Sequence, residues 1–338
     1  MIKISKSKQN QLFEKISLSM PLYLPVRKAG EVNYGLWEKD SEVAYETLKT
    51  VKSAKDFFFP QSENMMAFKT EGKNIEIIDI REKEQPFVIF GVKGCDYKAF
   101  EVLDKVFLSD PVDTYYKAKR EAGIIVTLAC NRPEESCFCK NFAIDASAPS
   151  GDATCWTDQN NIYIQANTEK GQTFVDLIKD LGEEWGEKEV EGIKNNINAI
   201  IEKLPYTNLN LSRFNPENLN ELFDDKQWES LSEACLGCGT CTFVCPTCQC
   251  FDIRDFKTNS GVLRYRCWDS CMYKDFTQMA AENSRKTQMQ RFRQRFMHKL
   301  VYFPAQYGTY SCVGCGRCVN KCPQNLNIIK VIKGLGDK

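Results

Sequence analysis

Two cysteine runs near the end of the chain constrain its structure more than any other sequence feature. Residues 235–246 read CLGCGTCTFVCP and residues 312–323 read CVGCGRCVNKCP. Each run has the spacing C-x2-C-x2-C-x3-C-P, in which three thiolates wrap one face of a cubane [4Fe–4S] cluster. The glycines between the cysteines let backbone N–H groups approach the cluster sulfides, and the final proline redirects the chain. The spacing therefore predicts two [4Fe–4S] clusters.

The fourth cysteine of each run lies too far along the chain to bind the same cluster comfortably, so we expect it to reach the other cluster. This predicts one cluster held by Cys235, Cys238, Cys241 and Cys322, and a second held by Cys312, Cys315, Cys318 and Cys245. Four thiolates also suit zinc, but zinc sites usually pair two separated C-x2-C units rather than one continuous run. Iron–sulfur clusters are the favoured interpretation.

Composition limits both the metal chemistry and the partners. The chain has 338 residues with 17 cysteines and one histidine, so its metal sites must be built almost entirely from thiolates. The 45 basic residues balance the 45 acidic residues, which argues against a nucleic-acid-binding protein. No apolar stretch is long enough to span a membrane. The first twenty residues lack a secretory signal, so we expect a cytoplasmic protein with reduced cysteines.

The distribution of cysteines suggests two domains, residues 1–225 and residues 226–338. The first alternates strand and helix patterns and is predicted to be an α+β (or α/β) domain. Its expected strands are residues 75–80, 87–92, 123–130 and 162–166, and its expected helices are residues 95–108, 173–181 and 187–204. The second shows almost no strand signal, with helices expected at 226–234, 284–303 and 326–333. It is predicted to be an α-helical ferredoxin-like domain carrying both clusters.

A second group of cysteines lies in the first domain. Cys95 follows one predicted buried strand, Cys130 ends another, and Cys137 and Cys139 come soon after. Because neighbouring strand ends converge, the four thiols could meet at one edge of a sheet and hold a third [4Fe–4S] cluster or a zinc ion. The alternative is that several are buried free thiols, which pack as small apolar side chains.

The other cysteines and a basic helix have weaker interpretations. Cys248, Cys250 and Cys271, with Cys267 nearby, crowd the first run; structural packing is favoured over a further three-thiolate site. Cys155 is expected in the core. The predicted helix at 284–303 carries a basic group, which could bind at the cofactor and raise cluster potentials, dock an acidic partner, or simply form a solvated face. This group consists of Arg291, Arg293, Arg295, His298 and Lys299.

No phosphate-binding loop, dinucleotide fingerprint, zinc-protease motif or nucleophile elbow occurs in the sequence. We recognise no active site: the chain can carry electrons but shows no site at which a substrate would be converted.

Several segments resemble a known family. The second part of the chain contains CLGCGTCTFVCPTCQCFDI, RCWDSCMYKDF, RFRQRFMHKL and YSCVGCGRCVNKCP, and the first part contains KDFFFPQSENMMAF, FVIFGVKGCDYKAFEVLDKVFL and CNRPEESCFC. These segments resemble the iron–sulfur electron-transfer subunit that anaerobic sulfite reductases share with cytoplasmic sulfhydrogenases, where it is the beta subunit. The resemblance covers about residues 50–140 and 226–325. It carries over Cys95, Cys130, Cys137 and Cys139 together, which favours a third [4Fe–4S] cluster. Cys248, Cys250 and Cys271 also match family positions, whereas Cys267 does not.

The resemblance implies a function and partners. A flavoprotein subunit that binds FAD and NAD(P)H would supply electrons, and this chain would relay them to a catalytic subunit. We expect an anaerobic sulfite reductase complex with a sirohaem subunit. The alternative is the beta subunit of a cytoplasmic NAD(P)-linked [NiFe] sulfhydrogenase, and an alternative of another class is a zinc-stapled structural or assembly protein.

Overall fold

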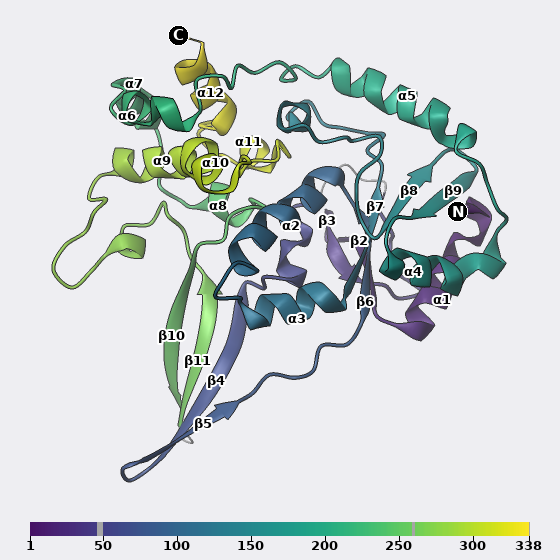
Figure 1. Cartoon of the computed structure of the whole chain (residues 1–338), viewed down its shortest axis with the longest axis horizontal. Helices are drawn as coiled ribbons and strands as arrows, with labels where there is room; N and C mark the ends of the chain where they lie inside the picture. Colours follow the sequence, from purple (N-terminus) through teal and green to yellow (C-terminus); the bar gives the residue numbers. More distant parts are fainter. Residues whose placement is uncertain (46–49, 259–260, 338) are drawn as a thin grey trace.

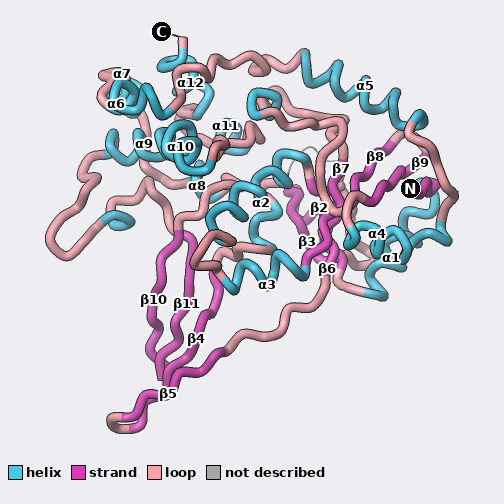
Figure 2. Tube along the Cα trace, in the orientation of Figure 1, coloured by secondary structure: helices cyan, strands magenta, loops and turns pink. Residues whose placement is uncertain are grey.

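The computed structural model describes residues 1–45, 50–258 and 261–337. It contains a seven-stranded sheet covered by helices, a four-stranded sheet that extends away from the main body, and a group of short helices near the C-terminus (Figures 1 and 2).

The seven-stranded sheet has the strand order β1-β9-β8-β7-β6-β2-β3. Its four central strands β2, β6, β7 and β8 are parallel, and antiparallel strands complete both edges. Strands β6 and β7 are buried along their whole length, as their continuous apolar sequences predict. The strands are β1 (Ile2–Ser5), β2 (Leu22–Lys28), β3 (Glu31–Leu36), β6 (Phe87–Val92), β7 (Gly123–Leu128), β8 (Ala153–Thr157) and β9 (Asn161–Ala166).

Helices cover both faces of this sheet. Alternate residues of β6 point to opposite sides: Val88 and Phe90 pack with helices α1 (Gln9–Ser19) and α4 (Glu169–Ile178), whereas Ile89 packs with α2 (Gly94–Phe107) and α3 (Thr114–Ala122). Helix α5 (Lys188–Glu202) packs on Trp156 of β8. The prediction of an α/β arrangement for this part of the chain is confirmed.

The four-stranded sheet corrects one expectation. Its order is β10-β11-β4-β5, formed by β4 (Ser62–Glu71), β5 (Asn74–Asp79), β10 (Phe251–Thr258) and β11 (Gly261–Trp268). The expectation of almost no strand after residue 226 was wrong: β10 and β11 lack the continuous apolar run of a buried strand, but their apolar and charged residues largely alternate, which is typical of a strand with one exposed face. Since β11 pairs with β4, this sheet joins segments from both sides of the predicted boundary after residue 225. Buried Arg266 of β11 anchors it through ion pairs with Glu63 and Asp113.

Short helices form the rest of the C-terminal part. They are α6 (Leu219–Phe223), α7 (Gln227–Ser232), α8 (Thr240–Phe243), α9 (Gln288–Met297), α10 (Phe303–Tyr307), α11 (Arg317–Asn320) and α12 (Ile328–Gly336). A π-helical turn, His298–Tyr302, joins α9 to α10. Pro304 lies in the first turn of α10 and cannot donate a backbone hydrogen bond, which gives a physical reason for the altered winding just before it. Within the described residues, none of the helices has both the length and the apolar character needed to cross a membrane.

Candidate metal centres

The first group of thiols combines both cysteine runs. Cys235, Cys238, Cys241 and Cys322 line one cavity, so the structure brings together the four residues that the spacing assigned to one cluster. Two donors point at these sulfurs: the Gln288 side-chain amide donates to Cys235 Sγ at 3.3 Å, and the Leu326 backbone N–H donates to Cys322 Sγ at 3.2 Å. Such N–H···S hydrogen bonds stabilise the negative charge of a bound cluster.

The second group consists of Cys245, Cys312, Cys315 and Cys318. Burial raises the pKa of Cys315 to about 12; nearby Arg317 lowers it, and Cys245 and Cys318 raise it further through their negative charge. The pKa of Cys312 is perturbed in the same direction, with burial as the main cause and Cys318 and Cys245 among its neighbours. Thiolates held this close repel one another, and bound cationic iron would offset that repulsion.

The third group lies at the carboxyl ends of β6 and β7. Cys95 stands in the first turn of α2, directly after β6, and Cys130 follows β7. Cys95, Cys130, Cys137 and Cys139 line one cavity, as expected from converging strand ends. Cys315 of the second group lines the same cavity.

The loop of the second run packs tightly against the segment that carries Cys137 and Cys139. The backbone N–H of Phe138 donates to the Gly314 carbonyl at 2.8 Å. Gly314 and Gly316 both have positive φ, and a Cβ at Gly314 would lie 2.5 Å from the Cys139 backbone nitrogen. A Cβ at Gly316 would lie 2.4 Å from the Ser136 carbonyl oxygen. These glycines therefore allow the third group to approach the second, a role beyond the contact with sulfides that the spacing suggested.

Within residues 1–45, 50–258 and 261–337, no three side chains of His, Cys, Asp or Glu lie close enough together to hold a single metal ion. A cubane cluster is held differently, because each thiolate bonds a separate iron at its own corner. The four sulfurs then stay farther apart than the thiolates around one zinc ion, which lie within about 4 Å of one another.

Two buried cations face the first and second groups. Arg295 is 2% exposed and lines the first cavity, and Lys299 is 3% exposed. In the part of the chain that the structure describes, neither forms an ion pair with a carboxylate, and Arg295 Nε lacks a hydrogen-bond partner. A buried charge is costly unless an opposite charge compensates it. Clusters with thiolate ligands are anionic, so the donor sets and these cations together fit [4Fe–4S] groups.

The other two predicted cofactor-binding arginines lie elsewhere. Arg291 donates hydrogen bonds to the carbonyls of Met272, Arg285 and Lys286, and Arg293 donates to the Phe223 carbonyl and covers its ring. Of the three arginines, the structure places only Arg295 at a cysteine cavity.

Three buried charged residues near the cysteine groups were not predicted from the sequence: Arg317, Asp96 and Lys55. Arg317 is buried and pairs with buried Asp96 through contacts of 2.5 and 2.7 Å, between the second and third groups. For Arg317, one sequence signal was present: the second run has an arginine where the first run has Thr240. Lys55 is also buried and donates to the Cys248 carbonyl at 2.8 Å, and nothing in its local sequence indicated this.

His298 should make the protein sensitive to acid. Burial, with Lys299 and Arg285 nearby, lowers its pKa to about 4, below the value of about 6.5 expected in the unfolded chain. The unfolded state then binds the proton first, so stability is lost as the pH falls from about 6.5 towards 4. This contribution amounts to about 2 kcal/mol at pH 5. Thermal unfolding of wild type and His298→Gln at pH 7.5 and pH 5 should show the smaller acid loss in the variant; an equal loss in both would contradict the assignment.

Two cysteines belong neither to the three groups nor to the set of Cys248, Cys250 and Cys271. Cys155 is fully buried in the core of the main sheet, as expected, and Cys267 is partly exposed on β11.

Comparison with known proteins agrees with this geometry. Residues 234–326 match the family described as "4Fe-4S dicluster domain", which supports two [4Fe–4S] clusters in this part of the chain. No solved structure matches the chain. Sulfhydrogenase 2 subunit beta from Pyrococcus furiosus is 32% identical over 335 residues, covering 95% of this chain and 94% of the relative. The chain therefore belongs to the family of iron–sulfur beta subunits of sulfhydrogenases.

Proposed function

We propose that this chain relays electrons between a flavoprotein that oxidises NAD(P)H and the catalytic subunit of a [NiFe] hydrogenase. The observation that carries the proposal is the position of Cys315. It belongs to the second cysteine group and also lines the cavity of the third, so the two groups share a wall.

The three groups follow one another in space. Cys315 connects the N-terminal group to the second group. Cys241 of the first group lies within electrostatic range of Cys318 and Cys245 of the second, in addition to its own neighbour Cys235. The resulting order is third group, second group, first group, and this series runs from the edge of the main sheet to the C-terminal helices.

The residues around the series suit a relay. A [4Fe–4S] cluster supplies reversible one-electron chemistry when bound. Arg295 and Lys299 place positive charge beside the first two groups, which favours added electrons, and both are held in position: Arg295 donates to the Cys241 carbonyl at 3.0 Å and Lys299 donates to Thr247 Oγ1 at 2.9 Å. Burial limits solvent contact at Cys245 and Cys315 of the second group and at Cys139 of the third, whereas Cys238 of the first group is exposed.

The relative's name favours a hydrogenase complex over the sulfite reductase expected from the sequence. The flavoprotein partner and the third cluster remain parts of the proposal. The match to a 4Fe–4S dicluster domain also argues against the zinc-stapled alternative for the two runs.

Iron content tests the proposal directly. Anaerobically purified protein is expected to contain about twelve iron and about twelve acid-labile sulfide per chain, and Cys130→Ser about eight of each. The reason is that serine replaces one of the four thiolates with a weakly binding hydroxyl, which should destabilise the third cluster. The measurement is elemental analysis together with an EPR spectrum after reduction.

A matched control is Cys267→Ser, a cysteine outside the three groups, which should retain the wild-type iron content. If wild type and Cys130→Ser both contain about eight iron, the N-terminal cysteines are structural and the relay is limited to two centres. Stoichiometric zinc without iron in protein never exposed to air would refute the relay.

A further inference from the structure

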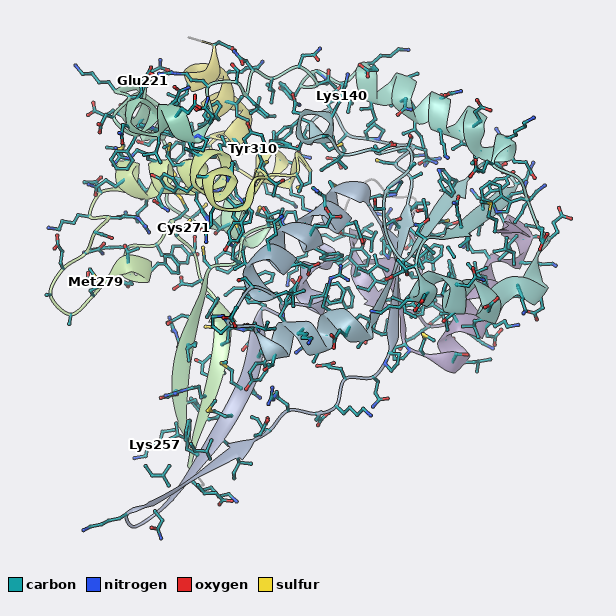
Figure 3. All side chains as sticks on the ribbon, viewed as in Figure 1. Lys140, Glu221, Lys257, Cys271, Met279 and Tyr310 are labelled. Carbon is teal, nitrogen blue, oxygen red and sulfur yellow. The ribbon has the colours of Figure 1, made fainter. Side chains whose placement is uncertain are left out.

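Two cysteines outside the three groups, Cys250 and Cys271, lie together at the base of the protruding hairpin, which is formed by β10 and β11. Cys250 directly precedes β10, and Cys271 follows β11. The hairpin pairing continues past the strand ends, because the Asp269 backbone N–H donates to the Cys250 carbonyl at 2.9 Å. In Figure 3, Cys271 lies where the hairpin meets the C-terminal helices.

The thiols of Cys250 and Cys271 are in direct contact. Their side chains lie close enough to share a hydrogen bond, and the backbone N–H of Cys271 lies near the Cys250 sulfur. Both partners are largely enclosed, and Cys271 is only 8% exposed. Sulfurs that share a hydrogen bond need only a small side-chain movement to reach bonding distance.

The turn between them is rigid. Ser270 is fully buried; its hydroxyl accepts hydrogen bonds from the Met272 backbone N–H at 3.2 Å and from Thr242 Oγ1 at 2.8 Å. Thr242 belongs to α8, inside the first cysteine run. The contact between the two thiols is therefore held from both sides, by the hairpin pairing and by the cluster-binding run.

The pair is linked to the second cysteine group and surrounded by positive charge. Cys248 shares a hydrogen bond with Cys245 and also lies within electrostatic range of Cys271. Lys55 and Lys299, both buried, lie near Cys250 and also near Cys248, and their positive charge lowers the pKa of Cys250. Buried ammonium groups stabilise a thiolate and so favour thiol–disulfide chemistry.

We propose that Cys250 and Cys271 form a redox-active dithiol that converts reversibly to an intramolecular disulfide beside the second cysteine group. Oxidation breaks two S–H bonds and forms one S–S bond, releasing two electrons and two protons; reduction reverses each change. A [4Fe–4S] cluster held by the second group would supply and accept these electrons one at a time, which rests on the proposed relay function. The pair thus stores two electrons next to one-electron carriers.

The acidity of the pair agrees with this role. The hydrogen bond from Cys271 lowers the pKa of Cys250 to about 7, while the same contact and burial raise the pKa of Cys271. One thiol of a redox dithiol commonly has a pKa near 7 and acts as the attacking thiolate.

Thiol counting on the intact, iron-loaded protein tests the proposal. Samples are poised anaerobically with dithionite and redox mediators over a range of potentials, quenched in acid, denatured and labelled with a maleimide. Wild type is expected to lose two labelled thiols per chain across one two-electron step, with the dithiol-to-disulfide ratio changing tenfold per about 30 mV. Peptide mass spectrometry without reduction should identify the Cys250–Cys271 pair.

Matched variants separate this proposal from the relay. Cys250→Ser and Cys271→Ser should abolish the two-thiol step and keep the wild-type iron content, whereas Cys267→Ser on the same hairpin should keep both. A constant thiol count in wild type, or a disulfide between other cysteines, would overturn the proposal. So would the loss of iron in Cys250→Ser, since the residue would then be a metal ligand. A two-thiol step that persists in protein lacking relay activity would refute only the relay.

Discussion

Replacing Cys315 with serine is expected to remove about four of about twelve iron per chain and to lower electron transfer through the complex by roughly 100-fold or more. Cys315 belongs to the middle group of the series and forms a wall of the third cavity. Its loss should therefore interrupt the path between the two outer groups. The measurements are iron content and H2-driven reduction of NAD(P)+ by the reconstituted complex.

The control for this prediction is activity that bypasses the chain. Direct reduction of an artificial dye by the catalytic subunit should remain unchanged in the Cys315→Ser complex, and Cys267→Ser should behave as wild type in every assay. Full H2-driven turnover in Cys315→Ser would exclude the proposed order of centres. A wild-type complex that instead couples NAD(P)H to sulfite reduction would identify the other acceptor.

Arg317→Met should destabilise the protein by about 3–5 kcal/mol, the usual cost of leaving one member of a buried ion pair without its partner. Arg317 and Asp96 are 3% and 1% exposed, and Arg317 also donates to the Thr50 carbonyl at 3.0 Å. The variant leaves the Asp96 carboxylate buried without its compensating cation. The expected readout is a thermal unfolding midpoint several degrees lower under anaerobic conditions.

An exposed ion pair provides the comparison. Arg264 and Asp255 form a two-point contact on the protruding hairpin, but their side chains are 39% and 46% exposed. Arg264→Met should therefore cost no more than about 1 kcal/mol. Similar losses in Arg264→Met and Arg317→Met would argue against a special role for the buried pair. Adding Asp96→Asn to Arg317→Met should recover part of the loss, because it removes the unpaired charge.

Local sequence patterns were sufficient where a segment is either continuously apolar or rich in cysteine. FVIFGV predicted strand β6 with its observed bounds, and the spacing of the two runs predicted that Cys322 would join Cys235, Cys238 and Cys241. The strand-end argument likewise placed Cys95 and Cys130 at a common edge, where the structure has their cavity.

Long-range features could not be predicted in this way. Strands β10 and β11 alternate apolar and charged residues and extend from the body, so neither carries the apolar run of a core strand. The pairing of β11 with β4 joins segments far apart in the chain. The buried positions of Lys55 and Arg317 depend on the same long-range packing, since a lysine or arginine is ordinarily exposed and its local sequence does not indicate otherwise.

The proposed exchange of fourth cysteines between the runs has a consequence for biosynthesis. The first cavity needs Cys322, which a ribosome adds long after Cys241, and the second group takes three of its four thiols from the same later run. Neither ligand set is complete on a nascent chain that carries the first run alone. With these ligand sets, we expect maturation factors to deliver iron and sulfide after the second run has been synthesised, and a chain that terminates before it lacks a complete ligand set for either cluster.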